Sequence, residues 1–345
     1  MKHKNQKPVV SVIIPNYNHA PFLKQRIDSV LSQTFEDFEI IILDDYSTDD
    51  SREIIEQYRK HPKVTRIVYN EINSGGVFKQ WVKGIEMAEG KYIWIAESDD
   101  YADEKFLEEA VKTLKKNPFA GMVFTDTTVV DAEGKILAVT SETKRTAYTQ
   151  LADSGNIINS DNVGPFLVSE MVIENASSAV FRKSALMEID FNPLAKYSNT
   201  GDRFVYIGIA LNSDIIFLPQ RLNFMRSHEH NTTRKNSENG NLHRDRLAVM
   251  LYYFDHLVTS SLNRQHVRKF YKNNYLYFMT HGSYEANRVL LEKLNAIEGL
   301  SKISFYFLSG YIYLLNKTQH QSGILRSLYY RMLLQLHHFN KDYQK

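Results

Sequence analysis

The sequence predicts an α/β fold, in which a doubly wound sheet flanked by helices is followed by a mainly helical C-terminal region. Strand and helix patterns alternate along the first 125 residues. The first strand pattern, residues 9–14, is β-branched apart from Ser11, as is typical of a strand buried on both faces of a parallel sheet. Beyond residue 241, aromatic and aliphatic side chains recur at helical spacing instead.

The strands and helices of the first half are predicted in order. Strands are expected at residues 9–14, 38–43, 64–69, 92–96 and 121–125. Four helices are expected. The first begins at Pro21, and the second follows the capping residues Thr48 and Asp49. The third spans residues 78–88, and the fourth runs from Asp103 to the residue before Pro118. Because strands that alternate with helices join by right-handed crossovers, they form a doubly wound sheet, and ligands bind beyond the carboxyl ends of its strands.

The pattern is looser from residue 129 onward. Residues 131–134 predict a hairpin turn between two short strands, and residues 141–160 read as a polar loop. Helices are expected near residues 184–187 and 204–211, with a strand at 215–218. Residues 234–241 are the linker candidate, and further helices are predicted at 247–257, 267–277, 284–294 and 303–336.

Length, composition and charge agree with two domains. The 345 residues include 43% apolar and 24% charged side chains, which is ordinary globular usage, and no cysteine, which excludes disulfides, thiolate zinc sites and a cysteine nucleophile. The net charge of +2 does not indicate nucleic acid as a partner. We predict one domain over residues 1–235, with a nucleotide-binding half (1–128) and an acceptor half (129–235), and a helical region over residues 236–345.

No export or membrane-spanning signal is visible in the sequence. The apolar run after the basic N-terminus, residues 8–15, is short and ends in proline, and the most apolar stretch near the C-terminus, residues 303–315, is shorter than the roughly 20 residues that span a bilayer. We therefore expect a cytoplasmic protein.

Carboxylates follow two of the predicted strands. Asp44 and Asp45 follow the second strand, and Glu97, Asp99 and Asp100 follow the fourth. Adjacent carboxylates repel one another unless a hard cation with oxygen ligands lies between them, and Mg²⁺ is typically held by one or two carboxylates together with substrate phosphates. The alternative is helix capping, which is the role expected for Asp49 and Asp103. Neither a phosphate-binding glycine loop nor a dinucleotide fingerprint fits the sequence.

Several motifs in order resemble the family 2 glycosyltransferases with a GT-A fold, whose Rossmann-like sheet is mixed. The resemblance is dense over residues 9–125, thinner to about residue 233 and absent from the helical tail. The motifs that carry it are Val10-Ser-Val-Ile-Ile-Pro-Asn-Tyr-Asn18, Ser32-Gln-Thr-Phe35, Ile42-Leu-Asp-Asp-Tyr-Ser-Thr-Asp49, Asn73-Ser-Gly-Gly76 and Ala88-Glu-Gly-Lys-Tyr-Ile-Trp-Ile-Ala-Glu-Ser-Asp-Asp100.

The resemblance implies roles on the donor side. Pro15 and Tyr17 shape the base pocket, and Asp45 accepts a hydrogen bond from a uracil-type N–H. The DxD motif of the family stands here as Glu97-Ser98-Asp99, where Glu replaces the first Asp and puts the ribose contact in doubt. Asp99 and Asp100 hold Mn²⁺ or Mg²⁺, without a distinction as to which is the direct ligand. Lys79 either faces the donor or is solvated.

The resemblance extends to the acceptor half. Glu174 and Asn175 belong to an acceptor-side segment, Asp202 is the catalytic base, and His228 of Arg-Ser-His approaches the metal or the diphosphate. A metal stabilises the charge of a leaving diphosphate, and a base activates the acceptor hydroxyl. If base and leaving group lie on opposite faces of the sugar, a single displacement inverts the anomeric carbon.

The leading hypothesis is therefore an inverting, metal-dependent glycosyltransferase of the hexosyltransferase type. It moves a sugar from a nucleotide-diphospho sugar, a UDP-sugar first of all, to a hydroxyl of a glycan or lipid-linked acceptor in surface polysaccharide synthesis. A non-catalytic nucleotide-sugar binding module is the alternative. A sugar nucleotidyltransferase is disfavoured because Asn16-Tyr-Asn-His19 stands where those enzymes favour a basic, glycine-rich loop.

The tail carries a separate hypothesis. Residues 241–345 contain 14 Lys and Arg against 6 Asp and Glu, a net charge of +8, so residues 1–240 carry −6. This charge, with many Tyr and Phe side chains, suits a peripheral contact with anionic lipid headgroups at the inner face of the plasma membrane. The same aromatic residues suit the core of a helical domain or a homodimer interface, and the sequence leaves both interpretations open.

Overall fold

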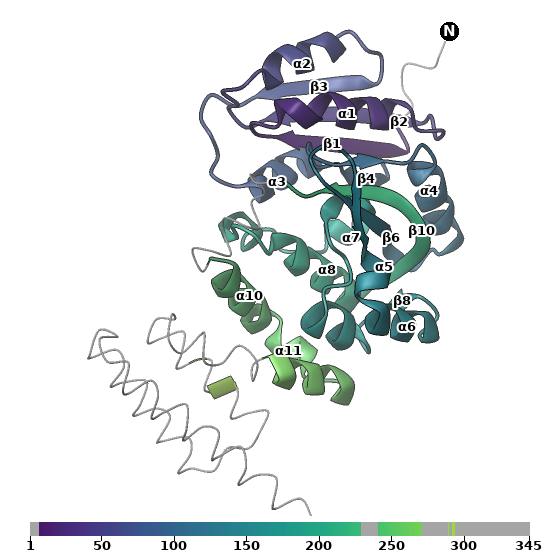
Figure 1. Cartoon of the computed structure of the whole chain (residues 1–345). Coiled ribbons are helices and arrows are strands. Elements are labelled where there is room, and N and C mark those ends of the chain that lie inside the picture. The colour runs from purple at the N-terminus through teal and green to yellow at the C-terminus, as the bar shows by residue number, and fades with distance from the viewer. Residues whose placement is uncertain (1–6, 229–240, 271–288, 290–291, 294–345) are drawn as a thin grey trace, which may run out of the picture. The chain divides into compact units, whose positions relative to one another are not determined.

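The computed structural model describes residues 7–228, 241–270, 289 and 292–293, and the chain divides into two compact units, residues 1–270 and 271–345. Nearly all the described residues belong to the first unit (Figure 1). The helix at Asn241–Tyr252 lies beyond the domain boundary that we predicted at residue 235, yet within the first unit. The predicted helices at 284–294 and 303–336 fall on residues outside the described ones, apart from residues 289, 292 and 293, and so does the linker up to residue 240.

The described part of the first unit is built on a ten-stranded mixed sheet (Figure 1). Its order is β3-β2-β1-β4-β9-β6-β10-β5, with β7 paired to β6 and β8 paired to β10. The strands are β1 (Val10–Asn16), β2 (Phe38–Asp44), β3 (Val64–Tyr69), β4 (Tyr92–Ile95), β5 (Tyr101–Ala102), β6 (Ala120–Val130), β7 (Ile136–Val139), β8 (Ile157–Ile158), β9 (Ala179–Arg182) and β10 (Asp214–Arg226).

Parallel pairing dominates the first half of the sheet. β1 lies between β2 and β4 and pairs with both in parallel, and β2 pairs with β3 in parallel. Every residue of β1 and β2 is buried, as expected for central strands covered on both faces. The antiparallel β9 then separates β4 from β6, which makes the sheet mixed, as predicted.

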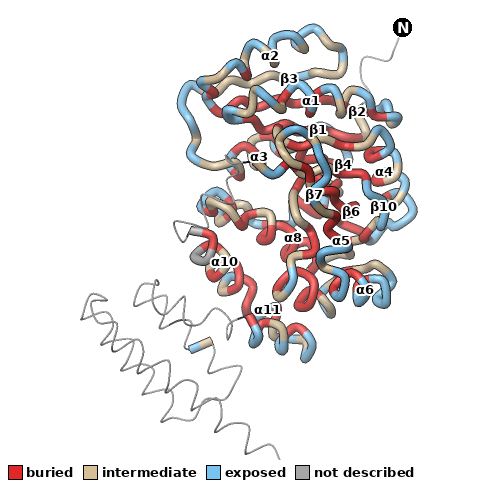
Figure 2. The backbone as a smooth tube through the Cα atoms, in the orientation of Figure 1, coloured by how far each residue is buried: buried red, intermediate tan, exposed pale blue. Residues whose placement is uncertain are grey.

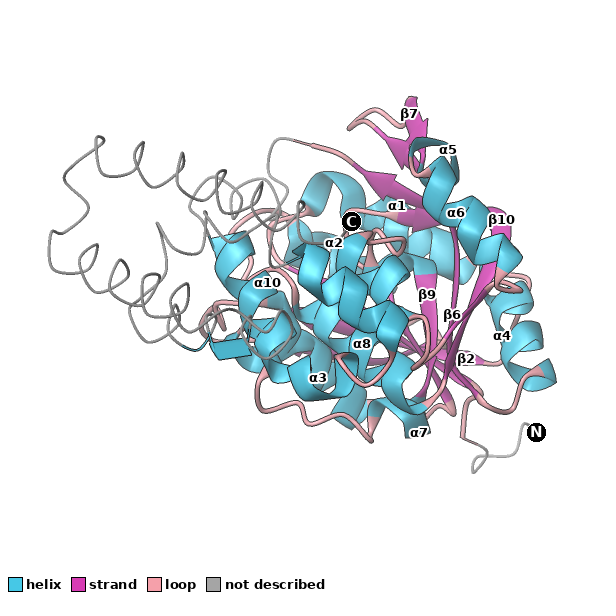
Figure 3. Cartoon of the chain, turned by 90° about the horizontal axis from the view of Figure 1, so that it is seen from below, coloured by secondary structure: helices cyan, strands magenta, loops and turns pink. Residues whose placement is uncertain are grey.

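Helices cover both faces of the sheet (Figure 3). They are α1 (Ala20–Leu31), α2 (Ser51–Tyr58), α3 (Val77–Met87), α4 (Phe106–Lys116), α5 (Thr140–Thr143), α6 (Arg145–Asp153), α7 (Lys183–Leu186), α8 (Gly201–Asn212), α10 (Asn241–Tyr252) and α11 (Phe254–Leu257), and residues 261–270 are also helical. The short turns are η1 (Gly164–Ser169), η2 (Ala176–Ser178) and η3 (Leu194–Lys196).

Side chains along β1 point alternately to the two faces of the sheet. Val10, Val12 and Ile14 share one apolar cluster with the buried side chains of α1 and α4. Ile13 points the other way, where α3 packs so closely that a Cβ on Gly84 would lie 2.5 Å from its Cγ2 atom. The buried core runs continuously through these strands (Figure 2).

Two details of the sequence prediction are corrected by the structure. Residues 141–160 are not a loop, because they contain α6 and β8; the prediction missed the buried stripe of Ala147, Tyr148 and Leu151 among polar neighbours. The strands predicted at 121–125 and 215–218 continue as β6 and β10, which pair with each other in parallel to Val130 and Arg226. No helix among the described residues has the length and apolar character needed to cross a membrane.

Candidate active site

The predicted donor-side residues gather where β1, β2 and β4 end. These three neighbouring strands are parallel, so their carboxyl ends meet at one edge of the sheet. Asn18 and Tyr46, just beyond β1 and β2, have φ angles of 55° and 66°, in the left-handed region. Strained backbone of this kind is concentrated at functional sites.

Exposed aromatic rings flank this edge. Tyr17 is 47% exposed and Tyr46 is 45% exposed, which is unusual for side chains of this size beside buried strands. Pro15 lies within β1, is buried and pairs with Leu43 of β2. The structure thus places Pro15 beneath the edge and Tyr17 on it, and it adds Tyr46, which the motif analysis did not single out.

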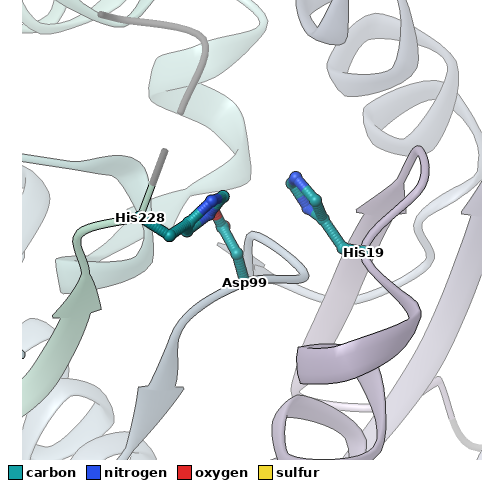
Figure 4. Close-up of side chains that lie close together, drawn as sticks. All are labelled: His19, Asp99 and His228. Atoms are coloured by element: carbon teal, nitrogen blue, oxygen red, sulfur yellow. The ribbon is translucent and has the colours of Figure 1, made fainter. Parts of the chain in front are cut away.

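Asp99, His228 and His19 lie together in an arrangement that could hold a metal ion (Figure 4). The Nε2 atom of His228 lies 3.1 Å from Oδ2 of Asp99, and one ligand atom from each of the three residues lies within 4.8 Å of the others. His19 bonds Ser98 Oγ through Nδ1 at 2.8 Å. Such a contact fixes the orientation of a metal-ligating imidazole. Sequence reasoning missed His19; its position three residues past the end of β1 was the available signal.

The donor set suits a transition-metal cation. One carboxylate and two imidazole nitrogens are ligands that Mn²⁺ accepts, whereas Mg²⁺ prefers oxygen ligands alone. Burial would raise the pKa of Asp99, but the hydrogen bond from His228 and the charges of His19 and His228 outweigh burial and lower it. Asp99 is therefore ionised at neutral pH, the form in which a carboxylate can bind a metal ion.

Asp100 makes different contacts from its neighbour. Its Oδ1 accepts the backbone N–H of Arg226 at 2.9 Å, and its Oδ2 accepts from Asn175 Nδ2 at 2.5 Å. Arg26, fully buried, lies 3.9 Å from the same Oδ2. Burial and the charge of Asp99 raise the pKa of Asp100 to about 6. Asp100 thus joins β10 and Asn175 to the β4 edge, whereas Asp99 faces the two histidines.

The two acceptor-side candidates both have partners within the protein. Asn175 bonds Asp100 and accepts a hydrogen bond from Asn223 Nδ2 at 3.0 Å, so its amide braces the carboxylate. Glu174 forms an ion pair with Lys144 at 2.5 Å and is 27% exposed.

Glu97 is held from three directions. Its Oε1 accepts from Trp81 Nε1 at 2.8 Å, its backbone N–H donates to Ser177 Oγ, and its carbonyl accepts from Arg26 Nε. Burial and the repulsion of Asp99 raise the pKa of Glu97 to about 8.

Asp45 anchors the loop before α3. Its carboxylate accepts from Asn70 Nδ2, from the backbone N–H and the hydroxyl of Ser74, and from Gln80 Nε2. Three of these four bonds fall on Oδ1, so Oδ2 keeps room for another donor. Lys79 is close by, and its Nζ donates to the carbonyl of Ser74 at 2.6 Å.

Asp202 lies in the first turn of α8, and a chain of contacts runs from its neighbour Gly201 to Glu97. A Cβ on Gly201 would lie 2.7 Å from the ring of Phe78, so only glycine lets α8 start so close to α3. Phe78 packs on Trp81 with ring centroids 5.1 Å apart, and Trp81 bonds Glu97. Both Asp202 and Glu97 also act electrostatically on the hydroxyl of Tyr206.

The environment of Asp202 suits a base. Burial raises its pKa to about 6, while the backbone N–H of Arg203 and the charges of Arg203 and Arg246 oppose the rise. A carboxylate with a pKa near 6 is mostly ionised at neutral pH and still accepts a proton readily. The site therefore combines a candidate cation site at the β4 edge with a separate carboxylate on α8.

Comparison with known families agrees with this geometry. The sequence profile of glycosyl transferase family 2 matches residues 11–188. Among curated proteins, TuaG of Bacillus subtilis, named for teichuronic acid biosynthesis, is 38% identical over 34% of this chain and 46% of its own length. Hyaluronan synthase of Pasteurella multocida is 34% identical over 39% of this chain and 14% of its own length. The chain thus spans less than half the length of these two relatives.

Solved structures share the fold. S. aureus TarS, residues 1–349, in complex with UDP superposes with a TM-score of 0.62 at 17% identity, covering 94% of this chain and 92% of that one. A mannosyltransferase from Pyrobaculum calidifontis in complex with GDP-Man and Mn²⁺ superposes with a TM-score of 0.55 at 16% identity, covering 94% and 83%.

Proposed function

Because the chain belongs to glycosyl transferase family 2, we propose that it is an inverting, metal-dependent enzyme that transfers a sugar from a UDP-sugar to a hydroxyl of a glycan or lipid-linked acceptor. The observation that carries the proposal is the cluster of Asp99, His228 and His19 at the sheet edge. Beside it in sequence, Glu97 bonds Trp81, which packs on Phe78, and Phe78 lies against Gly201, the neighbour of Asp202. The relatives named for teichuronic acid and hyaluronan support surface polysaccharide as the product class.

Asp99 and His228 would hold Mn²⁺, with His19 as a third ligand. When bound, the cation supplies Lewis-acid stabilisation of the charge that develops on the leaving diphosphate. Asp100 keeps Asp99 in place through its bonds to Arg226 and Asn175. Asp202 accepts the proton of the acceptor hydroxyl, and its position on α8, apart from the cluster, favours attack from the face opposite the leaving group and hence inversion.

The nucleotide would lie along the ends of β1 and β2. Tyr17 and Tyr46 offer exposed rings for the base, Pro15 forms the floor, and Oδ2 of Asp45 has room for an N–H donor. We assign the ribose contact to Glu97 and Ser98, which follow β4 at the same edge. Crystals of TarS with UDP and with UDP-GlcNAc support uridine over guanosine as our first choice of donor.

We place the enzyme in the cytoplasm, peripherally at the inner face of the plasma membrane. The support is the net charge of +8 over residues 241–345. A homodimer formed through the C-terminal residues is the competing role for the same segment.

The test of the base is Asp202→Asn. With a panel of UDP-sugars and Mn²⁺, we expect release of UDP to acceptor to fall by about 10²–10⁴-fold because the amide cannot take up the proton. Donor affinity, measured by calorimetry, should stay within a few fold. Asp161→Asn, at an exposed position, is the matched control and should keep full activity.

Two results would oppose the proposal. Full turnover by Asp202→Asn would refute the base assignment. Tight donor binding without transfer or hydrolysis by the unmodified chain would favour a nucleotide-sugar binding module.

A further inference from the structure

Buried polar atoms without a hydrogen-bond partner gather around Asp202. Four of the twelve such atoms found among the described residues belong to the residues flanking it and to the facing α10: Asn199 Nδ2, Thr200 Oγ1, Tyr206 Oη and Arg246 Nε. Buried polar groups are almost always paired, so a concentration of orphans indicates a missing partner. Two of the four atoms can only donate, and the two hydroxyls can donate as well.

Two guanidinium groups flank the same carboxylate. Arg203 follows Asp202 directly and is only 6% exposed, yet its guanidinium group forms no hydrogen bond or ion pair with the described residues. Arg246 comes from α10 and is partly buried, and its Nε has no hydrogen-bond partner among the described residues. Burying a cation without a partner is costly, so the two arginines mark a candidate site for an anionic ligand.

α10 is fixed against the start of α8 by specific contacts. Asp245, the neighbour of Arg246, accepts the backbone N–H groups of Ser198 and Asn199 at 2.7 and 3.0 Å. Tyr253, just past α10, packs on Phe204 of α8 with ring centroids 5.0 Å apart. The packing of both helices therefore holds Arg246 close enough for its charge to act on Asp202.

Arg203 and Arg246 act electrostatically on each other and on Asp202. Burial, and then the charge of Arg246, lower the pKa of Arg203 to about 10, which shows that the two cations repel each other. Asp202 is the carboxylate that acts on both of them. Among the described residues the other nearby carboxylate, Asp245, accepts the backbone N–H groups of Ser198 and Asn199. Two guanidinium groups with several unpaired donors around them suit an anionic ligand rich in oxygen.

We propose that Arg203 and Arg246 bind an anionic group, a phosphate or a carboxylate, carried by the substrate that reacts beside Asp202. The inference rests on the proposed function and narrows its substrate class. The planar guanidinium group binds both anions bidentately, which suits two arginines side by side. The anion belongs either to a phosphorylated or uronic acceptor, or to a uronic sugar on the donor.

Matched substrates distinguish these two sources. Donor pairs are UDP-glucuronate and UDP-glucose; acceptor pairs are oligosaccharides with and without a phosphate monoester. In Arg246→Gln we expect KM for the charged member of one pair to rise ten- to a hundred-fold, while KM for its neutral partner changes less than threefold. The pair that responds identifies the source. Arg246→Lys should restore part of the affinity, and Arg145→Gln, at an exposed site, should change nothing.

A binding measurement does not depend on turnover. Inorganic phosphate and glucuronate should raise the melting temperature of the unmodified chain and of Arg145→Gln, but not that of Arg246→Gln or Arg203→Gln. Loss of transfer with this response intact would count against the proposed function alone. If neither anion gives an arginine-dependent shift, or if the variants lower kcat equally for charged and neutral substrates at unchanged KM, the arginines serve only Asp202 and the inference is overturned.

Discussion

The charge on Asp202 depends on a balance between burial and two arginines. Burial raises its pKa to about 6, and the Arg203 backbone N–H and the positive charges of Arg203 and Arg246 oppose the rise. The base form is present above this pKa and is lost as pH falls through it.

We therefore predict an acid limb in the pH profile of kcat/KM. The value should fall about tenfold per pH unit below pH 6, as Asp202 becomes protonated. Arg246→Gln removes a charge that lowers this pKa, so its acid limb should move to higher pH, whereas the profile of Arg145→Gln should overlay that of the unmodified chain. An unshifted limb in Arg246→Gln would show that its charge does not reach the base.

A substitution of His19 tests whether Asp99, His228 and His19 form a metal site. Its ring lies within the 4.8 Å grouping with Asp99 and His228. We predict that His19→Ala raises the Mn²⁺ concentration for half-maximal activity about 10- to 100-fold, the range typical for lost metal-site contacts, and that His228→Ala raises it at least as much. His256→Ala, at an exposed position, is the control. Equal Mn²⁺ dependence in His19→Ala and the control would remove His19 from the site.

At the scale of elements, close packing of the turn before β4 positions the site. Gly90 has no room for a side chain, since a Cβ would lie 2.5 Å from the backbone nitrogen of Ser11 in β1. Its N–H donates to Ser11 Oγ at 2.8 Å. This contact sets the register in which β4 runs beside β1 and delivers Glu97 and Asp99 to the edge.

We predict that Gly90→Ala lowers the free energy of unfolding by about 1–3 kcal/mol, as overpacking against backbone does. Gly76→Ala is the matched control, because its Cβ would meet only the carbonyl of Tyr197 at 4.0 Å in an extended backbone. The two variants should separate in urea denaturation midpoints. Equal midpoints would show that β1 and β4 move apart to accommodate the methyl group without lowering the free energy of unfolding.

At the scale of the whole molecule, charge divides along the chain. Residues 1–240 carry −6 and residues 241–345 carry +8. A polybasic segment is attracted to anionic headgroups, each Lys or Arg near the surface contributing about 1 kcal/mol at physiological salt.

We expect the full chain to float with phosphatidylglycerol vesicles at low salt and to be released at about 1 M salt, where the Debye length falls to about 3 Å. Phosphatidylcholine vesicles are the control and should bind little. If the chain binds no anionic vesicles at any salt concentration and sediments as a dimer, we would assign the tail to self-association instead.

The sequence by itself was enough to predict the alternation of strands and helices to residue 125 and to find the family resemblance. It also singled out the carboxylates proposed for the site: Asp45, Asp99, Asp100 and Asp202. These follow from periodicity and motifs, which depend on neighbours a few residues apart. The mixed, doubly wound sheet was predicted correctly, but β9 was not, because its place between β4 and β6 depends on pairing with segments far away in the chain.

Only the tertiary structure separated Asp99 from Asp100. Adjacent in sequence, they lie in different environments because Arg226 and Asn175, brought in by β10 and η2, occupy Asp100. The tertiary structure likewise brings His19 close to His228, and it brings the charge of Arg246 close enough to act on Asp202. More than 40 residues of chain separate the two residues in each pair. Such contacts arise when the whole chain buries its apolar surface, and no local pattern records them.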